Sequence, residues 1–187
     1  MIVVLNGAPR AGKSSIAVVV QETFPGTWMN LGVDTARAAT PPSAQPGIGL
    51  RPGEPAHPAA VLVPTLYAAF WESVASHARL ALDVIVDVGL YDPAIAADAA
   101  RRLDSLDVLF VGVRCPVDVV LERRRQDGAY STEREAAERW EQAVHGHWDY
   151  DLEVDTSELS PAACAEAILR RLEEKPKPSA FARLAGL

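Results

Sequence analysis

Short, continuous apolar runs recur along the chain and predict the buried strands of a sheet. They cover residues 2–5, 84–86, 108–113 and 152–154, and most of their residues are valine, isoleucine or leucine. Runs of this length without polar alternation are typical of parallel strands that are covered on both faces. A further apolar segment begins at Trp28 and ends at Asp34, and we expect it to form the strand on the substrate side of the sheet.

Helical periodicity fills the intervals between the runs. Ahead of the run at 84–86, five residues recur at spacings of three and four and predict one face of a helix: Leu66, Phe70, Val74, His77 and Ala81. Further helices are expected at 16–20 and after residues 92, 116, 131 and 160, and Asp92 and Thr132 are the expected N-caps of two of them. Strands that alternate with helices predict an α/β fold, here a doubly wound parallel sheet with helices on both faces.

Two segments depart from this alternation. Residues 41–64 contain seven prolines, so no regular element is expected there. An insertion of this length is either a loose surface excursion or a loop that covers the substrate, and we favour the second interpretation. Residues 175–187 begin with Lys-Pro-Lys-Pro and predict an exposed C-terminal extension to a domain that spans residues 1–174.

Composition limits the classes of function. The chain has 187 residues, 49% of them hydrophobic, which suits one globular domain. The formal net charge of -7 argues against a nucleic-acid partner, because such a partner requires a clustered basic surface. The chain has no uncharged apolar stretch of about 18 residues, so no membrane span is expected. Cys115 and Cys164 lack C-x-x-C spacing, and we expect free thiols in a cytoplasmic protein.

The strongest motif follows the first apolar run. Residues 7–14 match the phosphate-binding loop (P-loop) pattern G-x-x-x-x-G-K-[ST], between a predicted strand and a predicted helix. In such a loop, backbone N–H groups surround phosphate oxygens, the lysine reaches the β- and γ-phosphates, and the serine hydroxyl ligates Mg²⁺. We therefore predict that Ser14 ligates Mg²⁺ and that a nucleoside triphosphate is bound by Gly7, Ala8, Pro9, Arg10, Ala11, Gly12, Lys13, Ser14 and Ser15.

Two aspartates end predicted strands and are candidates for the chemistry beyond the P-loop. Asp34 either accepts a proton from a substrate hydroxyl or caps the helix that follows it. Asp87 closes the run at 84–86, where a carboxylate can hold Mg²⁺ through water, although one aspartate at a strand end is a weak signal. Open α/β sheets bind their ligands at the carboxyl ends of the strands, where both residues are expected.

A dense basic cluster predicts a lid over the phosphates at about residues 122–134. It contains three consecutive arginines, of which Arg123 is the expected catalytic contact and Arg124 an expected nucleotide contact. Successive helix residues diverge by about 100°, so at most two of the three can face one site. The alternative is a solvated helix face in which Glu122 pairs with its neighbours.

Together, these residues resemble the chloramphenicol phosphotransferase family of P-loop kinases. The resemblance runs from residue 1 to about residue 172 and rests on residues 2–7, 11–15, 31–34, 84–87, 111–115 and 150–156, with Trp28, Trp71 and His145. It implies a single-domain kinase that transfers a phosphoryl group from ATP to a hydroxyl of a small molecule. By the same resemblance Asp34 matches the general base, Arg123 belongs to the lid, and Asp155 and Thr156 lie where related kinases wrap the adenine.

The acceptor is less well defined than the reaction. The family lid often continues with Arg-Gly-Asp-Arg, whereas residues 127–130 here read Asp-Gly-Ala-Tyr. We expect a small, partly apolar antibiotic with an accessible hydroxyl, and chloramphenicol is the first candidate. Its pocket is expected to be lined by Trp71, Tyr91 and Phe70. For Phe70, a place in the hydrophobic core is an equally good interpretation. Two other classes stay open: a regulatory module that binds nucleotide without catalysis, and a nucleoside-triphosphate hydrolase.

Overall fold

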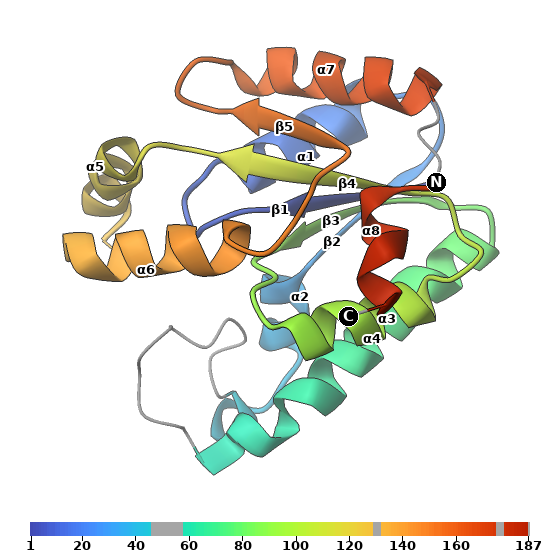
Figure 1. Cartoon of the computed structure of the whole chain (residues 1–187), viewed down its shortest axis with the longest axis horizontal. Coiled ribbons are helices and arrows are strands. Elements are labelled where there is room, and N and C mark those ends of the chain that lie inside the picture. Colours follow the sequence, from blue (N-terminus) through green and yellow to red (C-terminus); the bar gives the residue numbers. More distant parts are fainter. Residues whose placement is uncertain (46–57, 129–131, 175–177, 187) are drawn as a thin grey trace.

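The computed structural model describes residues 1–45, 58–128, 132–174 and 178–186. Its sheet has five parallel strands in the order β2-β3-β1-β4-β5 (Figure 1). The strands are β1 (Ile2–Asn6), β2 (Trp28–Gly32), β3 (Asp83–Val88), β4 (Val108–Arg114) and β5 (Leu152–Asp155). The predicted parallel sheet is therefore confirmed, although β2 ends at Gly32 and Asp34 already belongs to a helix.

Helices cover both faces of the sheet, as predicted. They are α1 (Lys13–Thr23), α2 (Val33–Ala38), α3 (Val63–Arg79), α4 (Pro93–Arg102), α5 (Val117–Asp127), α6 (Arg134–His145), α7 (Pro161–Glu174) and α8 (Ala180–Arg183). The helices α1 and α7 pack on one face, and α3, α4 and α8 cover the other (Figure 1). Successive residues of β1 alternate between these two cores, since neighbouring side chains of a strand point to opposite faces.

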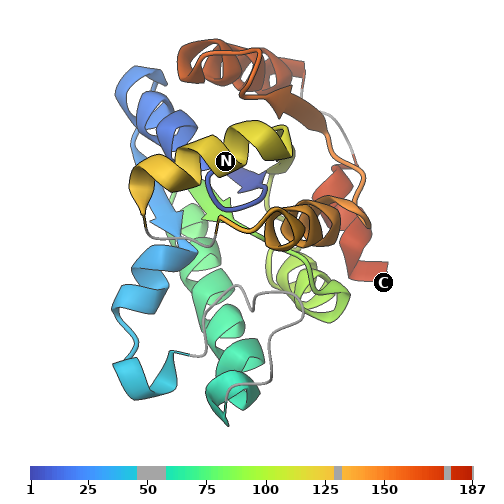
Figure 2. The same ribbon diagram turned by 90° about the vertical axis from the view of Figure 1, so that its left-hand side faces the viewer.

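The strand register brings the functional segments to one edge. Asp87 of β3 pairs with Leu5 of β1 and with Gly32 of β2. The P-loop follows β1 and α2 follows β2, so both segments emerge beside Asp87 at the carboxyl ends of the strands. Figure 2 views the molecule from this edge, with α5 and α6 in front of the sheet.

The predicted stripe on α3 is partly correct. Phe70 and Val74 are buried in the core, whereas His77 is half-buried and its Nδ1 lies 2.7 Å from the carbonyl oxygen of Ser73. Ala81 lies beyond the end of α3 and is exposed, with a φ of 63°. His77 therefore has a local structural contact with the preceding turn of its own helix.

One apolar segment has the length of a membrane span. By length and mean hydropathy alone, Pro58–Arg79 could cross a bilayer, although the chain was expected to contain no such segment. Within it, Trp71 and Val74 are fully buried against the sheet. One side of the segment therefore packs into the core, and 33% of its apolar window is buried.

The proline-rich segment contains more structure than predicted. Short 3₁₀ turns form at Pro42–Ala44 and Pro58–Leu62, and α3 already begins at Val63. Prolines stand at the start of these turns, where a missing N–H group costs little. The expectation that 41–64 holds no regular element is therefore wrong at both ends, and residues 46–57, the centre of the predicted covering loop, lie outside the described residues.

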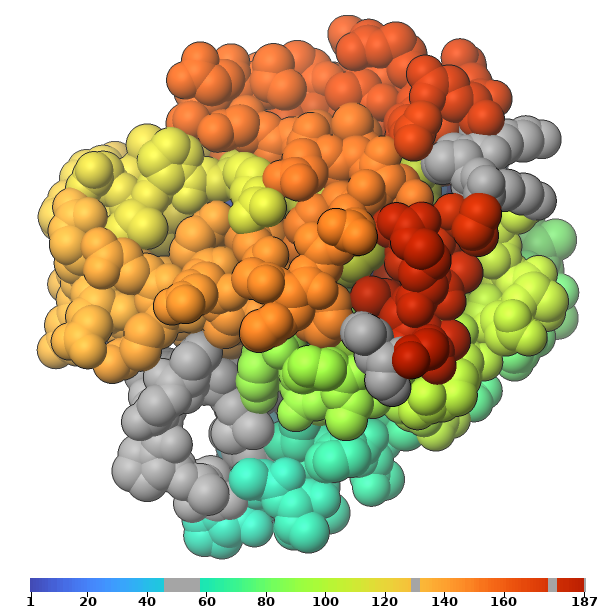
Figure 3. Space-filling model, viewed as in Figure 1, coloured from blue at the N-terminus to red at the C-terminus, as the bar shows by residue number. Residues whose placement is uncertain are grey.

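The predicted exposed C-terminal extension is also wrong, because α8 is part of the core. Phe181 is 1% exposed, and its ring packs 5.6 Å from Trp71 and 5.2 Å from Phe110, measured between centroids. The backbone N–H of Ala180 donates to Asp151 Oδ1 at 2.7 Å. In the space-filling view, α8 (red) lies between the residues around β5 (orange) and those around α4 (green) (Figure 3).

Candidate active site

The P-loop conformation depends on two glycines. A Cβ atom at Gly7 would lie 2.5 Å from the carbonyl oxygen of Val113, so no larger residue fits there. Gly12 is the N-cap of α1 and has a φ of 98°, a left-handed conformation that glycine adopts without strain. The loop therefore ends at the N-terminus of α1, where free backbone N–H groups and the helix dipole attract anions.

The Lys13 ammonium is held inside the P-loop. The residue is 8% exposed, and Nζ donates to the carbonyl oxygens of Gly7 at 2.9 Å and Ala8 at 3.0 Å. Nζ also lies 3.5 Å from Asp87 Oδ1. A buried cation needs such partners. Incoming phosphate oxygens can replace the carbonyl oxygens as acceptors without moving the charge far.

Ser14 and Asp87 place two oxygen atoms side by side. The Ser14 hydroxyl donates to Asp87 Oδ2 at 2.6 Å. Hydroxyl and carboxylate oxygens suit Mg²⁺, which binds nucleotides through one or two protein ligands together with phosphate oxygens. Among the described residues, no group of three or more His, Cys, Asp or Glu could hold a metal ion. The pair thus fits a metal whose coordination is completed by a bound nucleotide.

One cavity of about 440 Å³ unites the predicted phosphate and substrate residues. The P-loop contributes Pro9, Arg10, Gly12, Lys13, Ser14 and Ser15, and other elements contribute Asp34, Asp87, Arg123 and Thr156. The remaining predicted loop residues, Gly7, Ala8 and Ala11, are buried and do not line it. Residues from both ends of the chain therefore surround a single space.

Asp34 does not cap its helix. The N-cap of α2 is Gly32, and Asp34 lies in the first turn. The capping alternative for Asp34 is therefore wrong. The side chain is exposed and faces the cavity that Lys13 and Ser14 also line.

Arg123 joins α5 to the P-loop and to the segment after β5 at the edge of the cavity. Its guanidinium donates to the Arg10 carbonyl oxygen at 3.3 Å, to Thr156 Oγ1 at 3.0 Å and to the Thr156 carbonyl oxygen at 2.9 Å. Thr156 Oγ1 in turn donates to the Ala11 carbonyl oxygen at 2.7 Å. The solvated-face alternative is thus wrong for Arg123, because α5, the P-loop and the segment after β5 are bonded together around it.

Arg124 and Asp155, which were predicted to contact the nucleotide, do not line the cavity. Arg124 is 2% exposed on the inner side of α5 and is absent from the cavity lining. The Asp155 carboxylate accepts from the Ser157 N–H at 2.8 Å and the Ser157 hydroxyl at 2.6 Å, and it does not line the cavity either. Consecutive helix residues diverge by about 100°, and here Arg123 lines the cavity whereas Arg124 does not.

The aromatic residues near the substrate side differ from those expected. Trp71 is fully buried and packs on Phe70 and Phe181, so the prediction that Trp71 lines an acceptor pocket is wrong. Tyr91 is half-buried, with its ring centroid 5.9 Å from that of Trp140. Burial raises the pKa of Tyr67, and the charges of Tyr91, Asp92 and Asp34 raise it further. Tyr67 is buried in the core, and neither Tyr67 nor Tyr91 lines the cavity.

A buried polar network around Asn6 was not predicted from the sequence. Asn6, the last residue of β1, donates through Nδ2 to the Val144 carbonyl oxygen at 2.8 Å and to the Tyr150 hydroxyl at 3.0 Å. Its Oδ1 accepts from the Leu90 N–H at 2.6 Å. The Tyr150 hydroxyl lies 2.7 Å from His145 Nδ1, and burial lowers the pKa of His145 to about 4. An asparagine at the end of an apolar run was the available signal.

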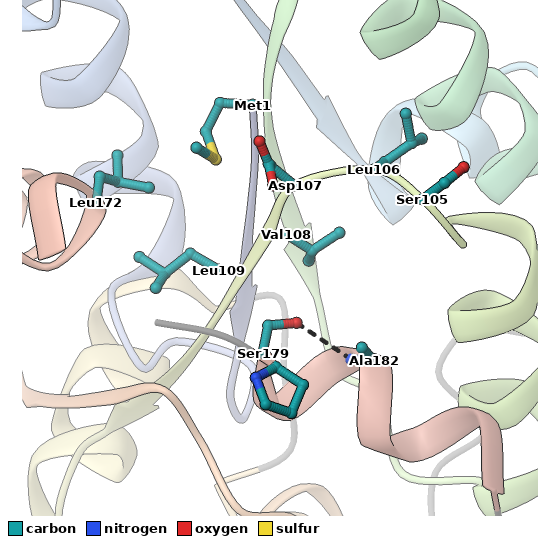
Figure 4. A pocket seen from close by; sticks show the side chains of 10 residues that line it. Met1, Ser105, Leu106, Asp107, Val108, Leu109, Leu172, Ser179 and Ala182 are labelled. Atoms are coloured by element: carbon teal, nitrogen blue, oxygen red, sulfur yellow. Dashed lines mark hydrogen bonds between the residues drawn. The ribbon is translucent and has the colours of Figure 1, made fainter. Parts of the chain in front are cut away.

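A second cavity, of about 400 Å³, lies at the opposite end of the strands (Figure 4). Met1, Leu109 and Leu172 gather on one side of it, and the Ser179 hydroxyl accepts from the Ala182 N–H at 3.2 Å. Its lining contains none of the P-loop residues. It is therefore separate from the cavity that Lys13 and Ser14 line.

Comparison with known proteins identifies relatives over nearly the whole chain. The family model described as "Chloramphenicol phosphotransferase-like protein" matches residues 1–173. Two proteins named "Putative O-phosphotransferase", from two strains of Mycobacterium tuberculosis, are each 25% identical and align over 98% of this chain and 87% of their own.

Solved structures share the fold. The tunicamycin resistance protein of Deinococcus radiodurans has a TM-score of 0.66 at 24% identity, covering 91% of this chain and 94% of its own. The APS kinase of Mycobacterium tuberculosis, in complex with AMPPNP and APS, has a TM-score of 0.67 at 20% identity, covering 92% and 96%. The shikimate kinase of Aquifex aeolicus has a TM-score of 0.57 at 18% identity, covering 93% and 97%. These similarities concern the fold alone.

Proposed function

The chain belongs to the chloramphenicol phosphotransferase-like family, and we propose that it is an ATP-dependent kinase that phosphorylates a hydroxyl group of a small molecule. The observation that carries the proposal is the single cavity lined by Lys13, the Ser14–Asp87 pair and Asp34. A phosphate-binding charge, a pair of metal-compatible oxygens and an exposed carboxylate are the groups that phosphoryl transfer to an alcohol requires.

The nucleotide occupies the P-loop side in this proposal. Backbone N–H groups of residues 10–15 surround the phosphates, and Lys13 exchanges its carbonyl acceptors for β- and γ-phosphate oxygens. Ser14 and Asp87 hold Mg²⁺, which supplies positive charge to the phosphates when it is bound. Thr156, Leu159 and Pro161 line the same cavity and contact the nucleoside. Arg123 closes α5 over this side and adds charge near the phosphates.

The acceptor approaches from the Asp34 side. Asp34 takes the proton of the acceptor hydroxyl as its oxygen forms a bond to the γ-phosphorus. The bond between that phosphorus and the β–γ bridging oxygen breaks, and ADP leaves with the electron pair. The acceptor is a partly apolar hydroxylated molecule in this proposal, an assignment that the family supports. Chloramphenicol is the first candidate through the family, and a tunicamycin resistance protein among the structural neighbours supports antibiotics as a class.

The cysteines and the net charge of the chain support a compartment and a class of partner for the proposed reaction. Cys115 and Cys164 are buried free thiols, which suits the reducing cytoplasm, where ATP is available. A net charge of -7 gives no support to a nucleic-acid partner. We therefore place the acceptor among small molecules of the cytoplasm.

Acceptor-dependent ADP release tests the proposal. Purified protein with ATP and Mg²⁺ should release ADP slowly alone and much faster when chloramphenicol, or a member of a panel of nucleoside and aminoglycoside antibiotics, is added. Release that is fast without any acceptor would favour a hydrolase. ATP binding without release under any condition would favour a regulatory module.

A further inference from the structure

Arg10 occupies a strained backbone position in the P-loop. Its φ is 73°, and it is one of three non-glycine residues with positive φ in the part of the chain that the structure describes. Glycine adopts this conformation without a steric cost, whereas a residue with a Cβ atom does not. Strain of this kind concentrates at ligand-binding sites, so the contacts of the Arg10 side chain are of interest.

Asp127 holds the Arg10 guanidinium in an ion pair. Asp127 is the last residue of α5, followed by the C-cap Gly128. A carboxylate at a helix C-terminus faces the negative end of the helix dipole, which is unfavourable for an anion. Both partners are therefore unusual at their positions, and each offsets the charge of the other.

The pair lies at the phosphate side of the active-site cavity. Arg10 lines this cavity together with Lys13 and Ser14, and its side chain is 39% exposed. Arg123, one turn before Asp127, donates to the Arg10 carbonyl oxygen at 3.3 Å. The end of α5 thus contacts both the backbone and the side chain of this one P-loop residue.

We propose that the Arg10 guanidinium binds the terminal phosphate of a nucleoside triphosphate, and that Asp127 holds this side chain when that phosphate is absent. The assignment rests on the proposed function, because its ligand is the triphosphate that the P-loop takes. A guanidinium forms paired, charge-assisted hydrogen bonds with carboxylate and with phosphate alike, so the two anions compete for it. A diphosphate lacks the terminal phosphate and leaves Arg10 with Asp127. Arg10 therefore distinguishes the substrate nucleotide from the product nucleotide.

Calorimetric titration of the full chain with Mg²⁺ and either AMPPNP or ADP tests this assignment. Arg10→Gly removes the guanidinium and relieves the left-handed strain. We expect AMPPNP affinity to fall about tenfold, as for a lost charged hydrogen bond. The affinity for ADP should stay within about twofold, and the melting temperature should stay unchanged or rise. A side chain that merely supports the fold would lower the melting temperature instead.

A change at Asp127, the partner of Arg10, should have the opposite effect on AMPPNP affinity. Asp127→Asn removes the competing carboxylate, so AMPPNP affinity should rise roughly two- to fivefold, as expected for a partly exposed ion pair, while ADP affinity stays unchanged. Asp118→Asn is the matched control, because Asp118 lies on the same helix in an ion pair with Arg134 that is outside the cavity. This control should change neither affinity.

The double variant completes the cycle. In the Arg10→Gly background, Asp127→Asn should leave AMPPNP affinity unchanged. Equal weakening of AMPPNP and ADP by Arg10→Gly, or an effect of Asp127→Asn that persists without Arg10, would overturn the assignment while leaving the kinase proposal intact. A wild-type chain that binds neither nucleotide would overturn both.

Discussion

The phosphate side and the substrate side of the cavity are built in different ways. On the phosphate side, Lys13 and Ser14 belong to one contiguous motif, and their polar atoms bond to the loop's own carbonyl groups and to Asp87. On the substrate side, Asp34 comes from α2, and the predicted acceptor contact Tyr91 comes from the segment after β3. Within the part of the chain that the structure describes, the Asp34 carboxylate has no hydrogen bond like the one that the Asp87 carboxylate accepts from Ser14.

This difference means that the reaction class and the choice of acceptor depend on different parts of the molecule. Backbone geometry within eight consecutive residues fixes where phosphate binds, so the reaction class follows from a local motif. Acceptor choice depends on side chains that meet only in the folded chain. One P-loop scaffold can therefore keep its phosphate chemistry while its acceptor changes.

The largest predicted effect is on the substrate side. Asp34→Asn keeps the shape of the side chain but cannot take a proton, so we expect kcat to fall about 10² to 10⁴-fold. The affinity for ATP, measured by calorimetry, should stay at the wild-type value. A variant that loses nucleotide affinity but keeps kcat at saturating ATP would place Asp34 on the phosphate side and break the comparison.

Lys13→Ala should act on the phosphate side. It removes the cation that lies in the P-loop, and losing one preorganised charge of this type costs about 10² to 10³ in rate. Steady-state kinetics with variable ATP should show this loss in kcat/KM for ATP. Near-wild-type turnover by a folded Lys13→Ala protein would contradict the role given to the loop.

Neighbouring arginines of α5 provide a matched pair. Arg123→Ala removes contacts to Thr156 and to Arg10, so ATP affinity should fall about tenfold with little change in stability. Arg124→Ala removes a buried side chain and should lower the free energy of unfolding by about 1–3 kcal/mol, with ATP affinity unchanged. Calorimetry and denaturant unfolding measure the two quantities. The opposite assignment of effects would mean that α5 presents its other face to the nucleotide.

The smallest predicted effect concerns the acceptor alone. Tyr91→Ala removes a ring that packs on Trp140, and we expect the KM for the acceptor to rise about threefold to tenfold. The KM for ATP should not change, because Tyr91 follows β3 and does not belong to the P-loop or to α5. Equal changes in both KM values would indicate a structural role for Tyr91.

Local signals in the sequence were reliable. The P-loop spacing and the apolar runs predicted the sheet and its phosphate edge, and Asp92 caps α4 through hydrogen bonds to Ala94 and Ile95, as predicted. Thr132 is not the N-cap of α6, which begins at Arg134 with Glu133 as its cap. That helix end differs by one residue from its prediction, because several residues in a row were suitable caps.

Long-range packing was beyond prediction from the sequence. Phe181 is buried because Trp71 and Phe110, both distant in sequence, form a site for its ring. Whether Arg123 or Arg124 faces the nucleotide depends on how α5 rests on the domain, which the residue order does not specify. The acceptor side depends on contacts of this kind, and a role for Tyr91 there stays a prediction.

Mass spectrometry of the acceptor after incubation with ATP and Mg²⁺ tests the central claim most directly. The account predicts that one member of the hydroxylated antibiotic panel, with chloramphenicol first, gains the mass of a single phosphoryl group. ADP should form in equal amount, and Asp34→Asn should abolish the product. Formation of ADP with every acceptor unchanged in mass would contradict transfer to a small-molecule hydroxyl.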